Sequence, residues 1–149
     1  MNTQDERVMG ALAHIAALLP VMGIIASIVI WVTQKDKSRF VAFQALQAIA
    51  YQLTFIVVWL IGMACYMGTF FLTFAGGIMG SVNPDTSLLT GGLFFLPFLV
   101  FFGLFALMGI WIIYAIIAAV MVFQGKDFRY FLIGRWVERY SQQMNGTPL

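Results

Sequence analysis

The feature that most constrains the fold is an almost charge-free stretch from Phe40 to Gly125, in which Asp85 is the only charged side chain. Across all 149 residues, 62% are hydrophobic and only 9% are charged, whereas soluble proteins average roughly a quarter charged residues. One soluble core cannot bury so much apolar surface, so lipid must cover the remainder. We therefore predict an all-α integral membrane helix bundle that forms a single domain, residues 1–149.

Three segments are apolar and long enough to cross a bilayer. They are predicted at about residues 8–32, 53–79 and 100–123. The first is interrupted by Pro20 and Gly23, and proline cannot donate a hydrogen bond to the preceding turn, so we expect either a kink or two short helices there. If the chain folds back at Pro20, the bundle has four segments, and the N-terminus lies on the same side as the C-terminus.

Three further pieces are predicted to lie at the membrane surface, at about residues 38–52, 91–99 and 126–140. The run from Lys37 to Gly80 contains no strong helix breaker and would be roughly 66 Å long as one helix. That exceeds the ~30 Å of hydrocarbon in a bilayer, so its first part must lie outside. The last piece mixes cations with aromatic rings, which favours an amphipathic segment with its rings in lipid. Docking to a soluble partner is the alternative.

Seven of the eight basic residues gather in two clusters that flank the apolar segments. They are Lys35, Lys37 and Arg39 in the first cluster, and Lys126, Arg129, Arg135 and Arg139 in the second. Such clusters mark the cytoplasmic face, so we expect a multi-pass inner-membrane protein whose C-terminus is cytoplasmic. In this orientation the basic residues contact the membrane surface. The net charge of +2 is too small to suggest nucleic acid as a partner.

A stripe of polar side chains follows the first basic cluster at helical spacing. We define the polar stripe as Gln44, Gln47, Tyr51, Gln52 and Thr54. Amides in membranes commonly hydrogen-bond to a neighbouring helix. The alternative is a polar conduit or groove, formed if several copies assemble.

His14 is the chain's only histidine and the one titratable group in the first predicted span. Ionisable residues inside a membrane are candidates for function, and a neutral imidazole can ligate the metal of a haem or chlorophyll. Gly10 and Ala11 are small, so a helix or a flat ligand could approach closely. Two interpretations remain open: a hydrogen-bonded or interfacial histidine, and a ligand or proton site. We predict no resident cofactor and no metal site.

Catalysis is not indicated by any group of residues. The sequence lacks a Ser–His–Asp set, a carboxylate pair, a Cys/His cluster and a phosphate-binding glycine loop. Cys65 is the only cysteine, and it reads as a small buried side chain in an apolar run. We therefore predict that the protein is not an enzyme.

Three short motifs resemble a family of small bacterial membrane proteins that is related to the channel-type subunit of the chloroplast inner-envelope protein translocon. They are Ala11-Leu12-Ala13-His14 with the Gly23…Trp31 run and the Lys35-Asp36-Lys37-Ser38 turn, then residues 43–52, and then Gly125-Lys126-Asp127-Phe128-Arg129-Tyr130. The family's histidine, asparagine and last proline fall here on Gln44, Ala50 and Phe131. The resemblance implies a compact bundle of three or four membrane helices and, by distant analogy, a role in protein translocation.

Three functional hypotheses follow. The first is a scaffold or accessory subunit that packs with itself as a homo-oligomer or with a larger membrane complex. The second is a translocation or channel-type component that uses the polar stripe. The third is tetrapyrrole binding through His14. The short loops, the many phenylalanines and the lack of intramembrane charge favour the first.

Overall fold

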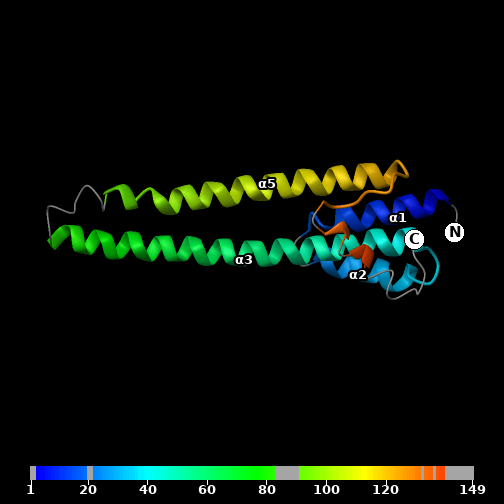
Figure 1. Ribbon diagram of the computed structural model, residues 1–149, viewed down its shortest axis with the longest axis horizontal. Coiled ribbons are helices and arrows are strands. Elements are labelled where there is room, and N and C mark those ends of the chain that lie inside the picture. Colours follow the sequence, from blue (N-terminus) through cyan, green and yellow to red (C-terminus); the bar gives the residue numbers. More distant parts are fainter. Residues whose placement is uncertain (1–2, 20–21, 83–90, 132, 136, 140–149) are drawn as a thin grey trace. The chain divides into compact units, whose positions relative to one another are not determined.

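The computed structural model describes residues 3–19, 22–82, 91–131, 133–135 and 137–139. Within these ranges the fold is all-helical and contains no strand. Its helices are α1 (Thr3–Ala16), α2 (Met22–Gln34), α3 (Arg39–Val82) and α5 (Leu96–Phe123) (Figure 1). The all-α class is confirmed, and the apolar character of α3 and α5 is consistent with a membrane helix bundle.

The first predicted span consists of two short helices. α1 has 14 residues and α2 has 13, so each is about 20 Å long and too short to cross hydrocarbon unaided. The two helices pack against each other. Pro20, at which the sequence predicts the break, lies outside the described residues. Of the two forms expected for residues 8–32, two short helices is therefore the one observed.

Gly23 permits the close approach between these two helices. A Cβ atom at this position would overlap the backbone carbonyl oxygen of Ala16. It would also lie 2.7 Å from Oε1 of Gln52. No residue with a side chain fits there, which explains the glycine in the first turn of α2.

Two segments of the described chain are long and apolar enough to cross a membrane: Arg39–Val82, with 44 residues, and Gly91–Phe123, with 33. The predicted span at 53–79 lies inside α3, and the piece at 38–52 forms the first turns of the same continuous helix. The predicted span at 100–123 lies inside α5. The prediction of three spans is not confirmed, because within the described chain only these two segments are both long enough and apolar enough to cross a membrane.

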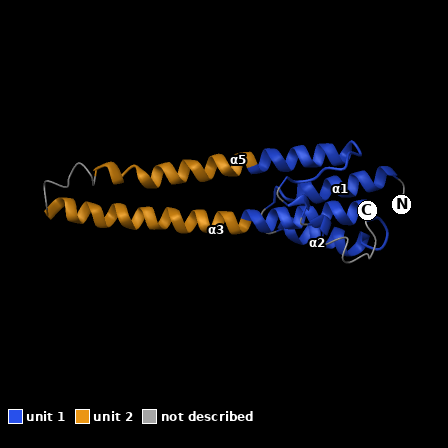
Figure 2. Ribbon diagram, viewed as in Figure 1, with its two compact units in different colours: residues 1–55, 111–149 blue, residues 56–110 orange. Residues whose placement is uncertain are grey.

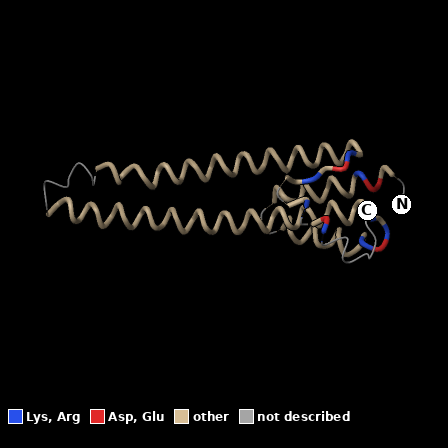
Figure 3. Tube along the Cα trace, in the orientation of Figure 1, with Lys and Arg blue, Asp and Glu red and all other residues tan. Residues whose placement is uncertain are grey.

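The chain divides into two compact units (Figure 2). Unit 1 contains residues 1–55 and 111–149, and unit 2 contains residues 56–110. Every charged residue that the structure describes belongs to unit 1 (Figure 3). Unit 2 is therefore uncharged over its described length, as lipid-facing sequence should be.

Unit 2 pairs the second half of α3 with the first half of α5, and we call these two helical segments, residues 56–82 and 96–110, the apolar stem. Leu104 packs directly on Gly62, where a Cβ atom would overlap its side chain. Thr73 donates a hydrogen bond to the backbone carbonyl of Leu93, at 2.8 Å. Most other large side chains of the stem are exposed. Cys65 is exposed as well, so the expectation that it is buried is wrong.

Gly125 turns the chain back at the end of α5. Its φ angle of 79° is in the left-handed region, and Lys126 N donates to Met121 O at 3.0 Å while Gly125 N donates to Val122 O at 2.9 Å. These two bonds form a Schellman motif, which ends a helix at a glycine. The chain then enters the segment that contributes to the candidate site.

Candidate functional site

The polar side chains of unit 1 converge on His14. The imidazole is fully buried, as are the side chains of Gln44 and Gln47 from α3. The fourth participant is the segment that follows Gly125, residues 126–131, which we call the C-terminal strap. Its side chains Phe128 and Tyr130 are also buried.

His14 makes two side-chain hydrogen bonds. Its Nδ1 lies 3.1 Å from the hydroxyl of Tyr130, and its Nε2 lies 3.0 Å from Oε1 of Gln44. These partners are 116 and 30 residues away in sequence. Both ring nitrogens are therefore engaged, and neither is free to ligate a metal in this arrangement.

The amide of Gln44 determines which tautomer fits. Its Nε2 donates to Oδ1 of Asp127 and to the backbone carbonyl of Phe128, both at 3.3 Å. Its oxygen therefore faces His14 and can only accept a hydrogen bond. We infer that His14 carries its proton on Nε2 and that Nδ1 accepts from the Tyr130 hydroxyl.

Gln47 binds the backbone of the strap at two points. Its Nε2 donates to the carbonyl of Phe128 at 3.0 Å, and its Oε1 accepts from the amide of Tyr130 at 3.0 Å. The side-chain amide pairs with the strap much as a neighbouring strand would. This satisfies two buried backbone groups that have lost contact with water.

Aromatic rings pack around this network. Tyr51 is stacked between Trp111 and Tyr130, with ring centroids 4.1 Å away on each side, and its hydroxyl donates to the carbonyl of Trp111 at 2.8 Å. Tyr114 meets Tyr130 edge-on. Aromatic contacts of this kind add about 0.5–1.5 kcal/mol each beyond burial of their area. The strap is thus held by ring packing as well as by amides.

An exposed ion-pair cluster lies on the outer side of the strap. Arg129 bonds to Asp127 at 3.0 Å and to Glu138 at 3.0 Å. The hydrogen bond to Asp127 and the two carboxylates raise the pKa of Arg129. Because Asp127 also accepts from Gln44, this carboxylate connects the buried network to the solvent-exposed charges.

Burial changes the acid–base behaviour of the site. α1 is not one of the two described segments that are long and apolar enough to cross a membrane. Desolvation lowers the pKa of His14 in this helix to about 4, opposed in part by the Gln44 hydrogen bond. Burial also raises the pKa of the Tyr130 hydroxyl well above its usual range. Both groups are neutral at physiological pH, so the network contains no buried charge.

The remaining members of the polar stripe, Gln52 and Thr54, bond to groups outside the His14 network. Gln52 donates to the hydroxyl of Ser27 at 3.1 Å, and Ser27 donates to the carbonyl of Ala13 at 3.1 Å. This chain joins α3, α2 and α1. Thr54 bonds to the carbonyl of Ala50 in its own helix, at 2.8 Å. Oε1 of Gln52 is buried without a hydrogen-bond partner among the described residues.

The structure thus brings together His14, Gln44, Gln47 and Tyr51 from the sequence-based candidates, and it separates Gln52 and Thr54 from them. The sequence analysis missed Tyr130, Asp127 and Ser27. Tyr130 and Asp127 belong to the strap, which the sequence predicts to be a membrane-surface segment with its aromatic rings in lipid. Instead, Phe128 is buried against protein, whereas Phe131 is 82% exposed. In the sequence, the one relevant signal is the alternation of aromatic and charged residues in Phe128-Arg129-Tyr130, which is typical of a strand-like segment with one buried face, but Phe131 interrupts it.

The predicted membrane-surface cations are all exposed, as a surface role requires. They are Lys35, Lys37, Arg39, Lys126, Arg129, Arg135 and Arg139. Lys35 lies over the ring of Trp31, with 5.7 Å between its Nζ and the ring centroid. Among the described ion pairs, both involve Arg129, whose charge is paired with Asp127 and Glu138. No group of three or more His, Cys, Asp or Glu side chains that could hold a metal ion occurs among the described residues.

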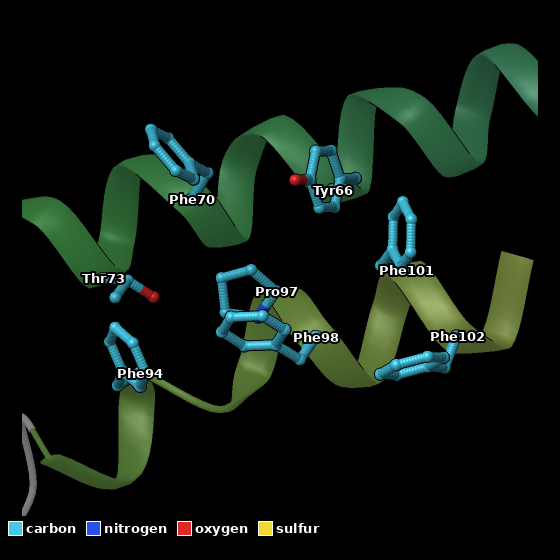
Figure 4. A pocket seen from close by; sticks show the side chains of 8 residues that line it. All are labelled: Tyr66, Phe70, Thr73, Phe94, Pro97, Phe98, Phe101 and Phe102. Carbon is cyan, nitrogen blue, oxygen red and sulfur yellow. The ribbon is translucent and has the colours of Figure 1, made fainter.

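A second candidate site is an apolar groove of about 330 Å³ in unit 2 (Figure 4). It is lined by Tyr66, Phe70 and Thr73 of α3 and by Phe94, Pro97, Phe98, Phe101 and Phe102. The hydroxyl of Thr73 is already bonded to backbone carbonyls. The groove therefore offers shape and apolar surface but no set of converging polar groups.

Comparison with known proteins assigns the chain to a family. Residues 5–137 match the magnetosome magnetite crystal formation protein family, which is a bacterial membrane protein family. No curated protein and no solved structure matches the chain. The suggested relationship to the chloroplast translocon subunit is not supported by this match. Both the match and the two long apolar helices indicate a membrane location. The chain belongs to the magnetosome magnetite crystal formation protein family.

Proposed function

We propose that this protein is a non-enzymatic accessory subunit of the magnetosome membrane that supports magnetite crystal formation by packing with other membrane proteins or with itself. The observation that carries the proposal is the family match over residues 5–137, which names crystal formation and no chemical reaction. The division of the chain into a polar network and an apolar stem supports it.

The polar groups of unit 1 support a structural use. His14, Gln44 and Gln47 are buried and bonded to one another or to the strap. A conduit would need these amides to face water, at least in one state. Their engagement with the strap argues for internal cohesion. We therefore do not propose a channel, nor do we propose tetrapyrrole binding through His14.

The apolar stem supplies the surface for packing. On α3, exposed residues recur at a spacing of 7, 4, 3 and 4, so they form one face of the helix. We call them the stem face: Leu60, Met67, Phe71, Phe74 and Ile78. A contiguous apolar face of this kind contacts either lipid or another membrane helix. The proposal is that a protein partner covers it.

The topology that fits this role has two spans. In it α3 and α5 cross the membrane, and the α1–α2 hairpin stays on the side that carries both basic clusters. That side is the cytoplasm under the positive-inside rule, so both termini are cytoplasmic.

The test deletes the gene in a magnetosome-forming bacterium, reintroduces the wild-type gene or a variant, and measures the size and number of magnetite crystals by electron microscopy. Deletion is expected to give smaller or fewer magnetite crystals, and the wild-type gene is expected to restore them. The variant Phe71→Ala/Phe74→Ala is expected to insert normally but to restore crystals poorly. Its matched control is Ile61→Ala/Leu72→Ala, which removes apolar side chains of similar exposure from an adjacent face.

The outcomes separate the parts of the proposal. Unchanged crystals in the deletion strain would refute a role in crystal formation. If both double variants restore crystals equally well, the stem face contacts lipid and the packing mechanism is wrong. A defect only in the stem-face variant supports a specific protein contact.

A further inference from the structure

We propose that His14 is a pH-sensitive latch, and that its protonation releases the C-terminal strap from the helices of unit 1. This inference does not depend on the proposed function. It rests on the position of one titratable ring between α1, α3 and the strap, and on the donor and acceptor roles that the neighbouring groups leave to it.

The closed state, in which the strap is bound to the helices of unit 1, requires a neutral imidazole at His14. Nδ1 must accept from the Tyr130 hydroxyl, because the amide of Gln44 assigns the proton to Nε2. A second proton on Nδ1 turns this acceptor into a donor. Two donors then face each other unless the hydroxyl rotates, and in the part of the chain that is described the hydroxyl has no other hydrogen-bond partner for its proton.

Among the described residues, the side chains hydrogen-bonded to His14 are uncharged, so none compensates a protonated ring. Of the helices packed around His14, α2 has no ionisable side chain, and α5 contributes only Tyr114. α3 contributes Arg39, which is exposed, and Tyr51, which is stacked behind Tyr130. α1 contributes Asp5, Glu6 and Arg7, which lie about two turns or more from the ring along the helix.

Asp127 of the strap brings a carboxylate into the network, but it bonds to Gln44 and not to His14, and it is paired with Arg129. A buried, uncompensated charge is unfavourable, so a protonated His14 favours the state in which the ring reaches water. The contact with Tyr130 is the one expected to break, because protonation turns Nδ1 from an acceptor into a donor. The bond to Gln44 is unaffected, since Nε2 donates in both states.

Linkage gives the size of the effect. The pKa of an exposed histidine is about 6.5, and burial lowers the pKa of His14 to about 4 while the strap is bound, which is the closed state. The ratio of open to closed strap is therefore expected to be roughly 30-fold larger at pH 5 than at pH 7.5. Above pH 7 the ratio should be constant.

Hydrogen–deuterium exchange of the full-length protein in lipid nanodiscs measures this ratio. The reporter is the strap peptide that contains the amide of Tyr130, which is bonded to Gln47. The reference is a peptide from the α3 part of the apolar stem, which has no charged side chain. After correction for the intrinsic pH dependence of exchange, the protection factor of the strap should fall about 30-fold between pH 7.5 and pH 5, and that of the reference should not.

Two variants remove the titration and keep one bond each. In His14→Asn the amide oxygen can still accept from Tyr130, and in His14→Gln the amide nitrogen can still donate to Gln44. Both are expected to lose the pH response. A constant protection factor of the wild-type strap between pH 7.5 and pH 5 would overturn the proposal. So would a fall in protection that persists in either variant.

Discussion

Replacing Gln47 with leucine is the most informative single perturbation, because this side chain satisfies two buried backbone groups of the strap at once. In Gln47→Leu the carbonyl of Phe128 loses a donor at 3.0 Å, and the amide of Tyr130 loses an acceptor at 3.0 Å. Leucine is similar in size, so no large cavity forms. The cost comes from unpaired polar groups.

Each buried group left without a partner costs about 1–3 kcal/mol. The carbonyl of Phe128 keeps its longer bond from Gln44, at 3.3 Å, which reduces its share. The additional apolar surface of leucine offsets a further part. We expect a net loss of about 3 kcal/mol in the free energy of unfolding.

Equilibrium unfolding in mixed micelles, followed by circular dichroism, measures this loss. The matched control is Gln124→Leu, the same exchange at an exposed position near the end of α5, which should stay within about 0.5 kcal/mol of the wild type. If Gln47→Leu is as stable as Gln124→Leu, the strap is not held by this amide and the argument fails.

Three other tests address different parts of the structure. Gly23→Ala should destabilise the protein by about 3 kcal/mol or more in the same unfolding assay, because the added Cβ overlaps the carbonyl of Ala16; wild-type stability would contradict the α1–α2 contact. Gly125→Ala should cost about 1–2 kcal/mol, since its φ of 79° is left-handed, whereas Gly77→Ala, with open space around its Cβ, should be neutral or stabilising by up to about 1 kcal/mol. Equal effects at the two glycines would refute the turn at the end of α5. The pH dependence of unfolding provides a third test, with His14→Asn as the comparison. The folded pKa of His14, about 4, lies below its ordinary value of 6.5, so the unfolded chain binds the proton first as pH falls. Stability should therefore drop by about 3 kcal/mol between pH 6.5 and pH 4 in the wild type, and this component should be absent from His14→Asn.

Sequence periodicity identified the important face of α3 but not what covers it. The spacing of Gln44, Gln47 and Tyr51 is a local property of one helix, so the stripe could be predicted. The partners of Gln44 and Gln47 in the strap lie 81–84 residues further along the chain. Hydrophobic periodicity contains no information about contacts at that distance. The cations and rings of residues 126–140 therefore read as a membrane-surface segment, although the rings of Phe128 and Tyr130 face protein.

The helices show a similar division. Proline and glycine near position 20 indicated an interruption, and two short helices are present there. The number of spans depends on whether each half can cross a bilayer alone, and composition cannot decide this because α2 is uncharged and mostly apolar. The length of α3 was predictable, since no strong breaker occurs between Arg39 and Val82, and the structure contains this stretch as one helix of 44 residues.

The polar network around His14 can be tested directly by solid-state NMR of the protein in lipid, with ¹⁵N-labelled histidine. Because the chain has one histidine, the two ring nitrogens give an assignable pair of signals. At pH 7.5 the structure predicts a neutral ring with its proton on Nε2 and with Nδ1 accepting a hydrogen bond. A charged imidazolium, a proton on Nδ1 or a metal-bound nitrogen would contradict it.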